Sequence, residues 1–254
     1  MKRICCFVIW ICFIALAWGQ DVLDKKIYGI DIGETIVFRN GKVSCPSVFA
    51  GAYDYKYQSE YDMNFLIVKK KNSCKSEKYL LLHSDNLLIL YKQGKQLPEV
   101  FGVYPFSLSE GLVFPNAKSI IVSSELREDY VIYRAENLRS LSVDTPWVEG
   151  VKGHGIGETL KFSANASGMY IMSGYVSFDK PYLWKQNSRP KKIRISFSDS
   201  DGIVEYELKD TPNPQYVDFN NFHQNEIITV EIMSVYEGLK YEDTCIHAVI
   251  FKAP

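Results

Sequence analysis

The segment KKIRISFSDSDGIVEYELK, residues 191–209, decides the fold class because apolar and polar residues alternate along it. Ile193, Ile195 and Phe197 fall on one face of an extended chain, and the polar residues between them fall on the other. Val204 and Tyr206 repeat the alternation in the second half of the segment. One buried and one solvated face is typical of antiparallel sheets, so the segment predicts two strands of a β-sandwich.

Short runs of the same kind recur along the chain, and no stretch shows sustained helical periodicity. In the second half, strands are predicted at residues 170–176, 191–196, 203–208, 215–219, 227–234 and 246–251. Their number and spacing are typical of a sandwich. We therefore expect an all-β protein.

The first half predicts a smaller β unit. Residues 35–39 and 42–45 flank Asn40-Gly41, a pair suited to a two-residue hairpin turn because both positions need a positive φ. Further strands are predicted at residues 62–70, 77–83 and 87–92. The last of these is apolar without alternation, which predicts a strand covered on both faces. Together these runs indicate a small meander or barrel.

The N-terminus has the features of a secretory signal. Lys2 and Arg3 precede an apolar stretch at residues 4–17, and the small residues Ala17 and Gly19 suit cleavage after residue 19. The stretch is shorter than the roughly 20 residues of a membrane-spanning helix, so no anchor is expected after cleavage. We expect a secreted or periplasmic bacterial protein with a small β-rich domain (residues 20–140) and a sandwich (residues 141–254).

Charge and composition narrow the range of partners. Of the 29 Lys and Arg residues, two are lost with the signal, so 27 remain against 30 Asp and Glu residues and the net charge is about −3. This balance argues against a nucleic-acid partner. His83, His154, His223 and His247 show no ligand spacing with one another or with cysteines, so neither a metal site nor a cofactor is expected.

Three of the six cysteines belong to the mature chain. Cys45 and Cys74 lie at predicted strand ends and could form a disulfide in an oxidising compartment, closing a loop of about 30 residues. Cys245 lies in an apolar strand and is expected to be a buried thiol.

A set of motifs in the second half resembles a known family. The segment PWVEGVKGHGIGE, residues 146–158, resembles the opening motif of the NADase-type glycan-binding domain family. The resemblance continues in order through SGY (173–175), KQNSR (185–189), FSD (197–199), LKDTP (208–212) and SVYEGLKYEDTCI (234–246). It covers about residues 146–252 and implies a discoidin-like, galactose-binding-like jelly roll, found beside the enzymatic part of secreted bacterial NAD glycohydrolases. The family domain is regarded as glycan-binding and not catalytic.

Candidate ligand-binding residues lie on two connections of this unit. The first carries Tyr175, Trp184, Asn187 and Arg189, and the second carries Tyr236, Tyr241 and Asp243. Aromatic platforms beside hydrogen-bonding groups are what a sugar site requires, and we expect the two connections to converge. Residues expected to shape the loops are Trp147, Glu149, Gly155, Gly157 and Glu158.

Structural interpretations of these residues stay open. The aromatic side chains could belong to the core, and Arg189 could pair with Asp243 or Glu149 to hold the loops. The basic run at residues 185–194 could favour a sulfated or sialylated ligand, or could be a solvated strand edge.

The sequence predicts an exported, non-catalytic carbohydrate-binding protein whose partner is a carbohydrate or glycoconjugate. One alternative is a protein-docking or adhesion module that contacts an envelope or host protein. Another is an enzyme accessory subunit, or an enzyme whose first half cleaves NAD. The absence of a clustered Glu, Arg and Ser pattern in that half argues against the last interpretation.

Overall fold

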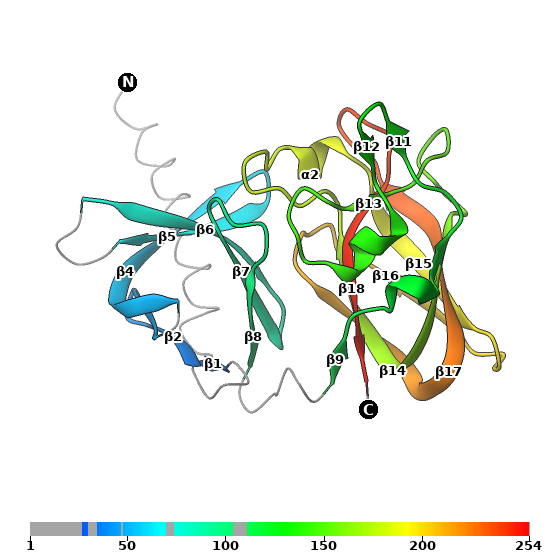
Figure 1. Cartoon of the computed structure of the whole chain (residues 1–254), viewed down its shortest axis with the longest axis horizontal. Helices are drawn as coiled ribbons and strands as arrows, with labels where there is room; N and C mark the ends of the chain where they lie inside the picture. Colours follow the sequence, from blue (N-terminus) through cyan, green and yellow to red (C-terminus); the bar gives the residue numbers. More distant parts are fainter. Residues whose placement is uncertain (1–26, 30–34, 47, 70–73, 104–110, 254) are drawn as a thin grey trace, which may run out of the picture.

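A computed structural model of the chain describes residues 27–29, 35–46, 48–69, 74–103 and 111–253. The predicted signal peptide, residues 1–19, lies outside these residues. Two β units lie side by side: a barrel, coloured blue to teal in Figure 1, and a sandwich, coloured green to red. The predicted all-β class with a C-terminal β-sandwich is confirmed.

The first unit is a closed barrel of eight antiparallel strands in chain order. Asn40 (φ 52°) and Gly41 (φ 70°) form the predicted hairpin turn between β2 and β3, and pairing of β1 with β8 closes the barrel. The strands are β1 (Ile27–Gly29), β2 (Thr35–Arg39), β3 (Lys42–Cys45), β4 (Phe49–Glu60), β5 (Met63–Lys69), β6 (Ser76–His83), β7 (Leu87–Lys92) and β8 (Glu99–Val103).

The second unit is one long sheet folded over into a sandwich, with strand order β13-β18-β14-β17-β15-β16. Its strands are β9 (Leu112–Val113), β10 (Ile120–Val122), β13 (Trp147–Val148), β14 (Thr159–Ser173), β15 (Arg189–Phe197), β16 (Ile203–Glu207), β17 (Gln215–Tyr236) and β18 (Cys245–Lys252). The long strands β14 and β17 pair with each other on both sides of irregularities near Ala166, which lets one sheet supply both layers.

Side chains on β15 confirm the alternation seen in the sequence. Ile193, Ile195 and Phe197 are buried in the sandwich core, where they meet Ile228 and Val230 of β17. The predicted domain boundary at residue 140 differs from the structure, because β9 and β10 already pair with β18 and β14. These strands have two and three residues, too few for a periodic pattern to identify them.

The remaining elements are short. A small hairpin, β11 (Arg127–Glu128) and β12 (Val131–Ile132), stands apart from the main sheet. The helices within the described ranges are the 3₁₀ turns η1 (Ala117–Ser119) and η2 (Ala135–Arg139) and the single turn α2 (Leu183–Gln186). Among the residues described, none of the helices is long and apolar enough to span a membrane.

The barrel and the sandwich are joined by a hydrophobic cluster, here called the shared core. Strand β7 illustrates it: Leu88 and Leu90 face the barrel interior, whereas Leu87, Ile89 and Tyr91 face the sandwich. The shared core consists of Met63, Phe65, Leu80, Leu82, Leu87, Ile89 and Tyr91 from the barrel and Leu141, Val143, Tyr170, Met172, Val176, Phe178, Trp184, Ala248 and Ile250 from the sandwich. The prediction that β7 is covered on both faces is confirmed: the barrel interior covers one face, and the sandwich covers the other.

The predicted bridge between Cys45 and Cys74 is wrong in this structure. Cys45 is buried inside the barrel at the end of β3, whereas Cys74 is exposed before β6. Strands β4 and β5 lie between β3 and β6 in the barrel, and in the part of the chain that the structure describes neither cysteine forms a disulfide. Cys245 is a buried thiol, as predicted.

A buried histidine lies against the barrel. The Nε2 atom of His247 on β18 is 3.0 Å from the hydroxyl oxygen of Tyr91 on β7, and its Nδ1 atom has no hydrogen-bond partner among the residues described. Burial lowers the pKa of His247 to about 3. The folded protein therefore holds a neutral imidazole where the unfolded chain would take up a proton below about pH 6.5.

The protein should lose stability as the pH falls, because below about pH 6.5 the unfolded state binds a proton at His247 that the folded state does not. Between pH 7 and pH 5 this single group should cost about 2 kcal/mol of unfolding free energy. Urea denaturation of the wild type and of His247→Gln at both pH values measures the contribution of His247 to this loss of stability. All other titrating groups are present in both proteins, so their effects cancel in the comparison. Equal losses in the two proteins would contradict the assignment.

Candidate functional site

The two connections that carry the candidate ligand-binding residues meet at one rim of the sandwich. The Tyr241 main-chain N–H donates to the carbonyl of Gln186 at 2.8 Å, and the Ser188 N–H donates to the carbonyl of Asp243 at 2.9 Å. These main-chain bonds fix the loop at residues 237–244 against the segment that contains α2. The structure thus brings the two connections together.

A groove lies along this rim, with a volume of about 390 Å³. Its walls come from the β11–β12 hairpin, from the segment around α2 and from the loop before β18. We call it the rim groove; its residues are Leu126, Glu128, Tyr133, Val148, Tyr175, Lys180, Tyr182, Leu183, Gln186, Asn187, Lys240, Tyr241 and Asp243. An adjoining hollow shares Tyr182, Gln186 and Lys240 with it and adds Tyr61 from the tip of the barrel's β4–β5 hairpin.

Four of the seven candidate residues, Tyr175, Asn187, Tyr241 and Asp243, line the rim groove. The hydroxyl of Tyr175 donates to the carbonyl of Asp144 at 3.1 Å, so its ring is held in place. Tyr241 is 37% exposed, which leaves part of its ring open to a ligand. Burial raises the pKa of Asp243, and the negative charges of Glu128 and Glu242 raise it further.

Trp184 and Arg189 do not line the rim groove, and both are buried. The Arg189 Nε atom donates to Asp210 at 2.7 Å and Nη2 donates to the same carboxylate at 3.3 Å. Its Nη1 atom donates to the carbonyls of Trp184 and Asn187, and its guanidinium lies 4.6 Å from the Trp184 ring centroid. Arg189 therefore holds the loop that presents Asn187. The predicted partners Asp243 and Glu149 are wrong, and the sequence analysis missed Asp210.

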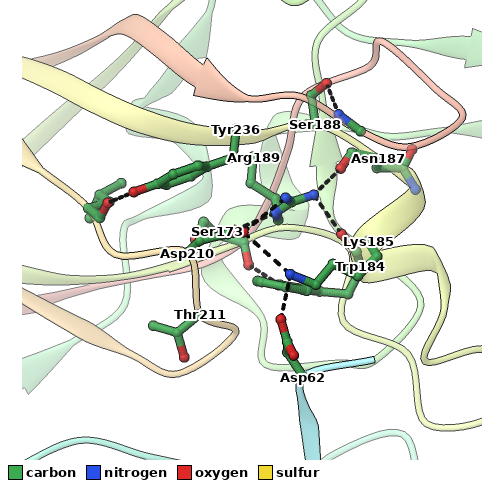
Figure 2. Close-up of polar contacts among 12 residues, drawn as sticks. Asp62, Ser173, Trp184, Lys185, Asn187, Ser188, Arg189, Asp210, Thr211 and Tyr236 are labelled. Carbon is green, nitrogen blue, oxygen red and sulfur yellow. Dashed lines mark hydrogen bonds and ion pairs between the residues drawn. The ribbon is translucent and has the colours of Figure 1, made fainter. Parts of the chain in front are cut away.

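Lys185 links the same network to the barrel. Its ammonium pairs with Asp62 in the turn after β4 and lies 3.4 Å from Asp210, and it is 4.6 Å from the Trp184 ring centroid (Figure 2). The ring of Tyr61 meets that of Tyr182 edge-on at 6.2 Å beside this contact. The barrel hairpin therefore supports the rim from below.

The basic run at residues 185–194 is balanced by acidic partners. Lys191 pairs with Glu207, Lys192 pairs with Glu205, and Arg194 pairs with Glu205 and Glu231. These partners lie on the neighbouring strands β16 and β17. The pairing agrees with a solvated strand edge and gives no support to a sulfated or sialylated ligand there.

Tyr236 lies away from the rim groove. It pairs in register with Arg189 across the strands β17 and β15, and its hydroxyl donates to the carbonyl of Leu208 at 2.9 Å. This contact fixes the segment that carries Asp210, so Tyr236 contributes to the support of Arg189.

Glu149 organises the loop that opens the family motif. Its carboxylate is buried and accepts hydrogen bonds from the N–H groups of Val151 at 2.8 Å and Thr244 at 3.2 Å. Burial raises the pKa of Glu149. A Cβ atom at Gly155 (φ 63°) would lie 2.5 Å from Cγ of Glu149, so this position requires glycine.

The other residues expected to shape the loops also lie there. Trp147 is buried, and its Nε1 atom donates to the carbonyl of Ser124 at 3.0 Å. The carboxylate of Glu158 accepts hydrogen bonds from the hydroxyls of Ser123 and Ser124. Gly157 has a φ of 91°, a conformation that glycine adopts without strain.

Sequence reasoning missed one wall of the rim groove. Glu128 and Tyr133 come from the β11–β12 region, whose strands have two residues each and therefore show no periodicity. Tyr133 meets Tyr175 edge-on at 6.2 Å, which places a tyrosine pair in this wall.

A family model described as NAD glycohydrolase translocation F5/8 type C domain matches residues 114–252. A search of curated proteins found no match. Among solved structures, the chain is similar to one titled "Structure of allantoicase", with 9% sequence identity and a TM-score of 0.33. That similarity covers 80% of this chain and 81% of the other.

Proposed function

Because this chain belongs to the NAD glycohydrolase translocation F5/8 type C domain family, we propose that it is an exported, non-catalytic protein that binds a carbohydrate or glycoconjugate in the rim groove. The observation that carries the proposal is the grouping of tyrosine rings with carboxylate and amide groups in one groove of fixed loops. Sugar rings present apolar C–H faces and directional hydroxyls, and this combination matches both.

Different residues of the rim groove would make the stacking contacts and the hydrogen bonds to a sugar. The partly exposed ring of Tyr241 offers a face for stacking, while the carboxylate of Asp243 can accept bonds from sugar hydroxyls. Asn187 supplies both a donor and an acceptor type in one side chain. Main-chain bonds hold the two loops together, so little ordering is needed on binding.

The environment of Cys245 supports a non-catalytic role for the strand beneath the loops. Burial raises the pKa of the Cys245 thiol well above its usual value, so the thiolate that would act as a nucleophile is disfavoured. His247, two residues away, is buried against Tyr91. Neither side chain lines the rim groove.

Removal of the Tyr241 ring should weaken carbohydrate binding about tenfold, because one stacked ring is lost while the loop backbone stays in place. The measurement applies labelled mature protein to a broad glycan array and then determines affinities for the glycans it binds. Phe222→Ala is the matched control, since Phe222 is an exposed aromatic residue of β17 that does not line the rim groove. Equal affinities of wild type and Tyr241→Ala for every bound glycan would contradict the proposal.

A protein-docking or adhesion role is the second candidate, and exposed apolar side chains around the rim favour it. Leu239 is 82% exposed, and Ile156 and Val151 are exposed as well. Two results together would favour this candidate over the first. The protein would bind no glycan on the array, and it would still bind cells whose surface glycans have been removed enzymatically. Leu239→Asp would weaken that binding to cells.

A further inference from the structure

We propose that a second saccharide site, here called the junction groove, lies where the β6–β7 turn of the barrel meets the sandwich. Its hollow measures about 610 Å³, within the usual range for small-molecule sites. The residues that define it are Asn86 from the barrel and Tyr170, Tyr206, Thr211, Asn213 and Tyr216 from the sandwich. It shares no residue with the rim groove, and it goes beyond the function proposed above.

Both modules build the junction groove. The main-chain N–H of His83 donates to Oδ1 of Asn213 at 3.1 Å, and the Asn86 Nδ2 atom donates to the hydroxyl of Tyr170 at 3.4 Å. These bonds cross from one unit to the other at the margin of the shared core, to which Tyr170 belongs. The groove therefore requires the packed pair of modules.

Two partly exposed tyrosine rings, Tyr206 and Tyr216, give the junction groove its apolar surface, and the Tyr170 ring beside Tyr216 is buried. Tyr170 and Tyr216 are register partners on β14 and β17, and their ring centroids lie 5.1 Å apart. Tyr206 lies on the edge strand β16 and is partly exposed. Partly exposed rings next to polar groups suit the C–H faces of a sugar ring better than they suit a fully apolar ligand.

Amide and hydroxyl groups supply directional hydrogen bonding beside these rings. The side chain of Asn213 uses its Oδ1 atom to accept from His83, which leaves the two Nδ2 hydrogens as donors. Asn86 uses its Nδ2 group toward Tyr170 and keeps Oδ1 as an acceptor. The hydroxyl of Thr211 accepts from the Asn213 N–H and keeps its hydrogen as a donor.

The charges of the junction groove indicate an uncharged ligand. The ionised side chains among its lining residues are one carboxylate, Asp85, and one ammonium, Lys209, so their charges balance. An acidic or amino sugar would meet both signs, whereas a neutral sugar requires neither. The site therefore fits a short neutral oligosaccharide.

The test uses the full mature protein labelled with ¹⁵N and titrated with neutral trisaccharides from β-glucan, mannan, galactan and chitin. We expect at least one of these probes to shift the side-chain amide signals of Asn86 and Asn213. Tyr206→Ala should weaken that binding about tenfold, while Tyr206→Phe, which keeps the ring, should stay close to the wild type. Tyr241→Ala should leave these signals and their affinity unchanged.

The outcomes separate this inference from the function of the rim groove. If the probes shift only the Gln186 and Asn187 amides, the junction site is overturned and the rim proposal stands. If only the Asn86 and Asn213 amides shift, the junction site is supported, and the rim proposal is decided separately by the glycan array. The junction site would be overturned if millimolar probe shifted neither the Asn86 and Asn213 amide signals nor those of Gln186 and Asn187. It would also be overturned if Tyr206→Ala left the shifts of the Asn86 and Asn213 signals unaltered.

Discussion

Replacing Arg189 with alanine should lower the free energy of unfolding by about 2 to 4 kcal/mol, because two buried carbonyl groups lose a charged donor while Asp210, 30% exposed, loses its partner. The Arg189 side chain is 5% exposed and donates to two carbonyls and to Asp210. Its removal leaves these acceptors without their donor and takes the guanidinium from the face of Trp184.

Arg194→Ala is the matched control for this substitution. Arg194 lies on the same strand, β15, and pairs with Glu205 and Glu231, but its side chain is 37% exposed. Exposed pairs contribute about 0 to 1 kcal/mol, so the control should unfold at nearly the wild-type urea concentration. Urea denaturation followed by tryptophan fluorescence measures both variants, and similar losses for Arg189→Ala and Arg194→Ala would refute the structural role of Arg189.

Ile89→Ala on the barrel should destabilise the sandwich by about 2 to 5 kcal/mol, because the side chain belongs to the shared core. The described tryptophans, Trp147 and Trp184, are both buried in the sandwich, so their fluorescence reports the unfolding of that unit. If the shared core makes the two units unfold together, the cavity left by Ile89→Ala should shift the unfolding transition that is followed by tryptophan fluorescence.

The control for Ile89→Ala is Leu97→Ala, which removes an exposed leucine between β7 and β8. It should leave the unfolding midpoint almost unchanged, because little apolar surface is lost from a core. A tryptophan transition that Ile89→Ala does not move, together with a separate earlier transition seen by far-UV circular dichroism, would mean that the units unfold independently.

Much of the fold could be predicted from the sequence where patterns are local. The Asn40-Gly41 turn and the alternation of Ile193 and Ile195 appear in the structure as predicted. The unbroken apolar run at residues 87–91 predicted two covered faces, yet it gave no indication of what covers them. Periodicity reports that a face is buried, and the cover can come from any part of the chain. The shared core therefore required the structure.

The candidate site, like the fold, could be predicted from the sequence only in part. The motifs predicted which two connections meet, and the structure brings them together. They did not separate Tyr241, whose ring is partly exposed in the groove, from Trp184, whose ring is buried. Exposure of a loop aromatic depends on long-range neighbours, such as Asp210 beneath the loop. Asp210 is 21 residues from Arg189 in sequence, so spacing alone did not identify the pair.

The position of β18 determines when the molecule can complete its folding during synthesis. This strand lies between β13 and β14, and its alternate side chains enter both the sandwich core and the shared core. Neither core can close before residues 245–252 have emerged from the ribosome. Until then the growing chain carries two open apolar surfaces, a state that exposes it to aggregation and to chaperones.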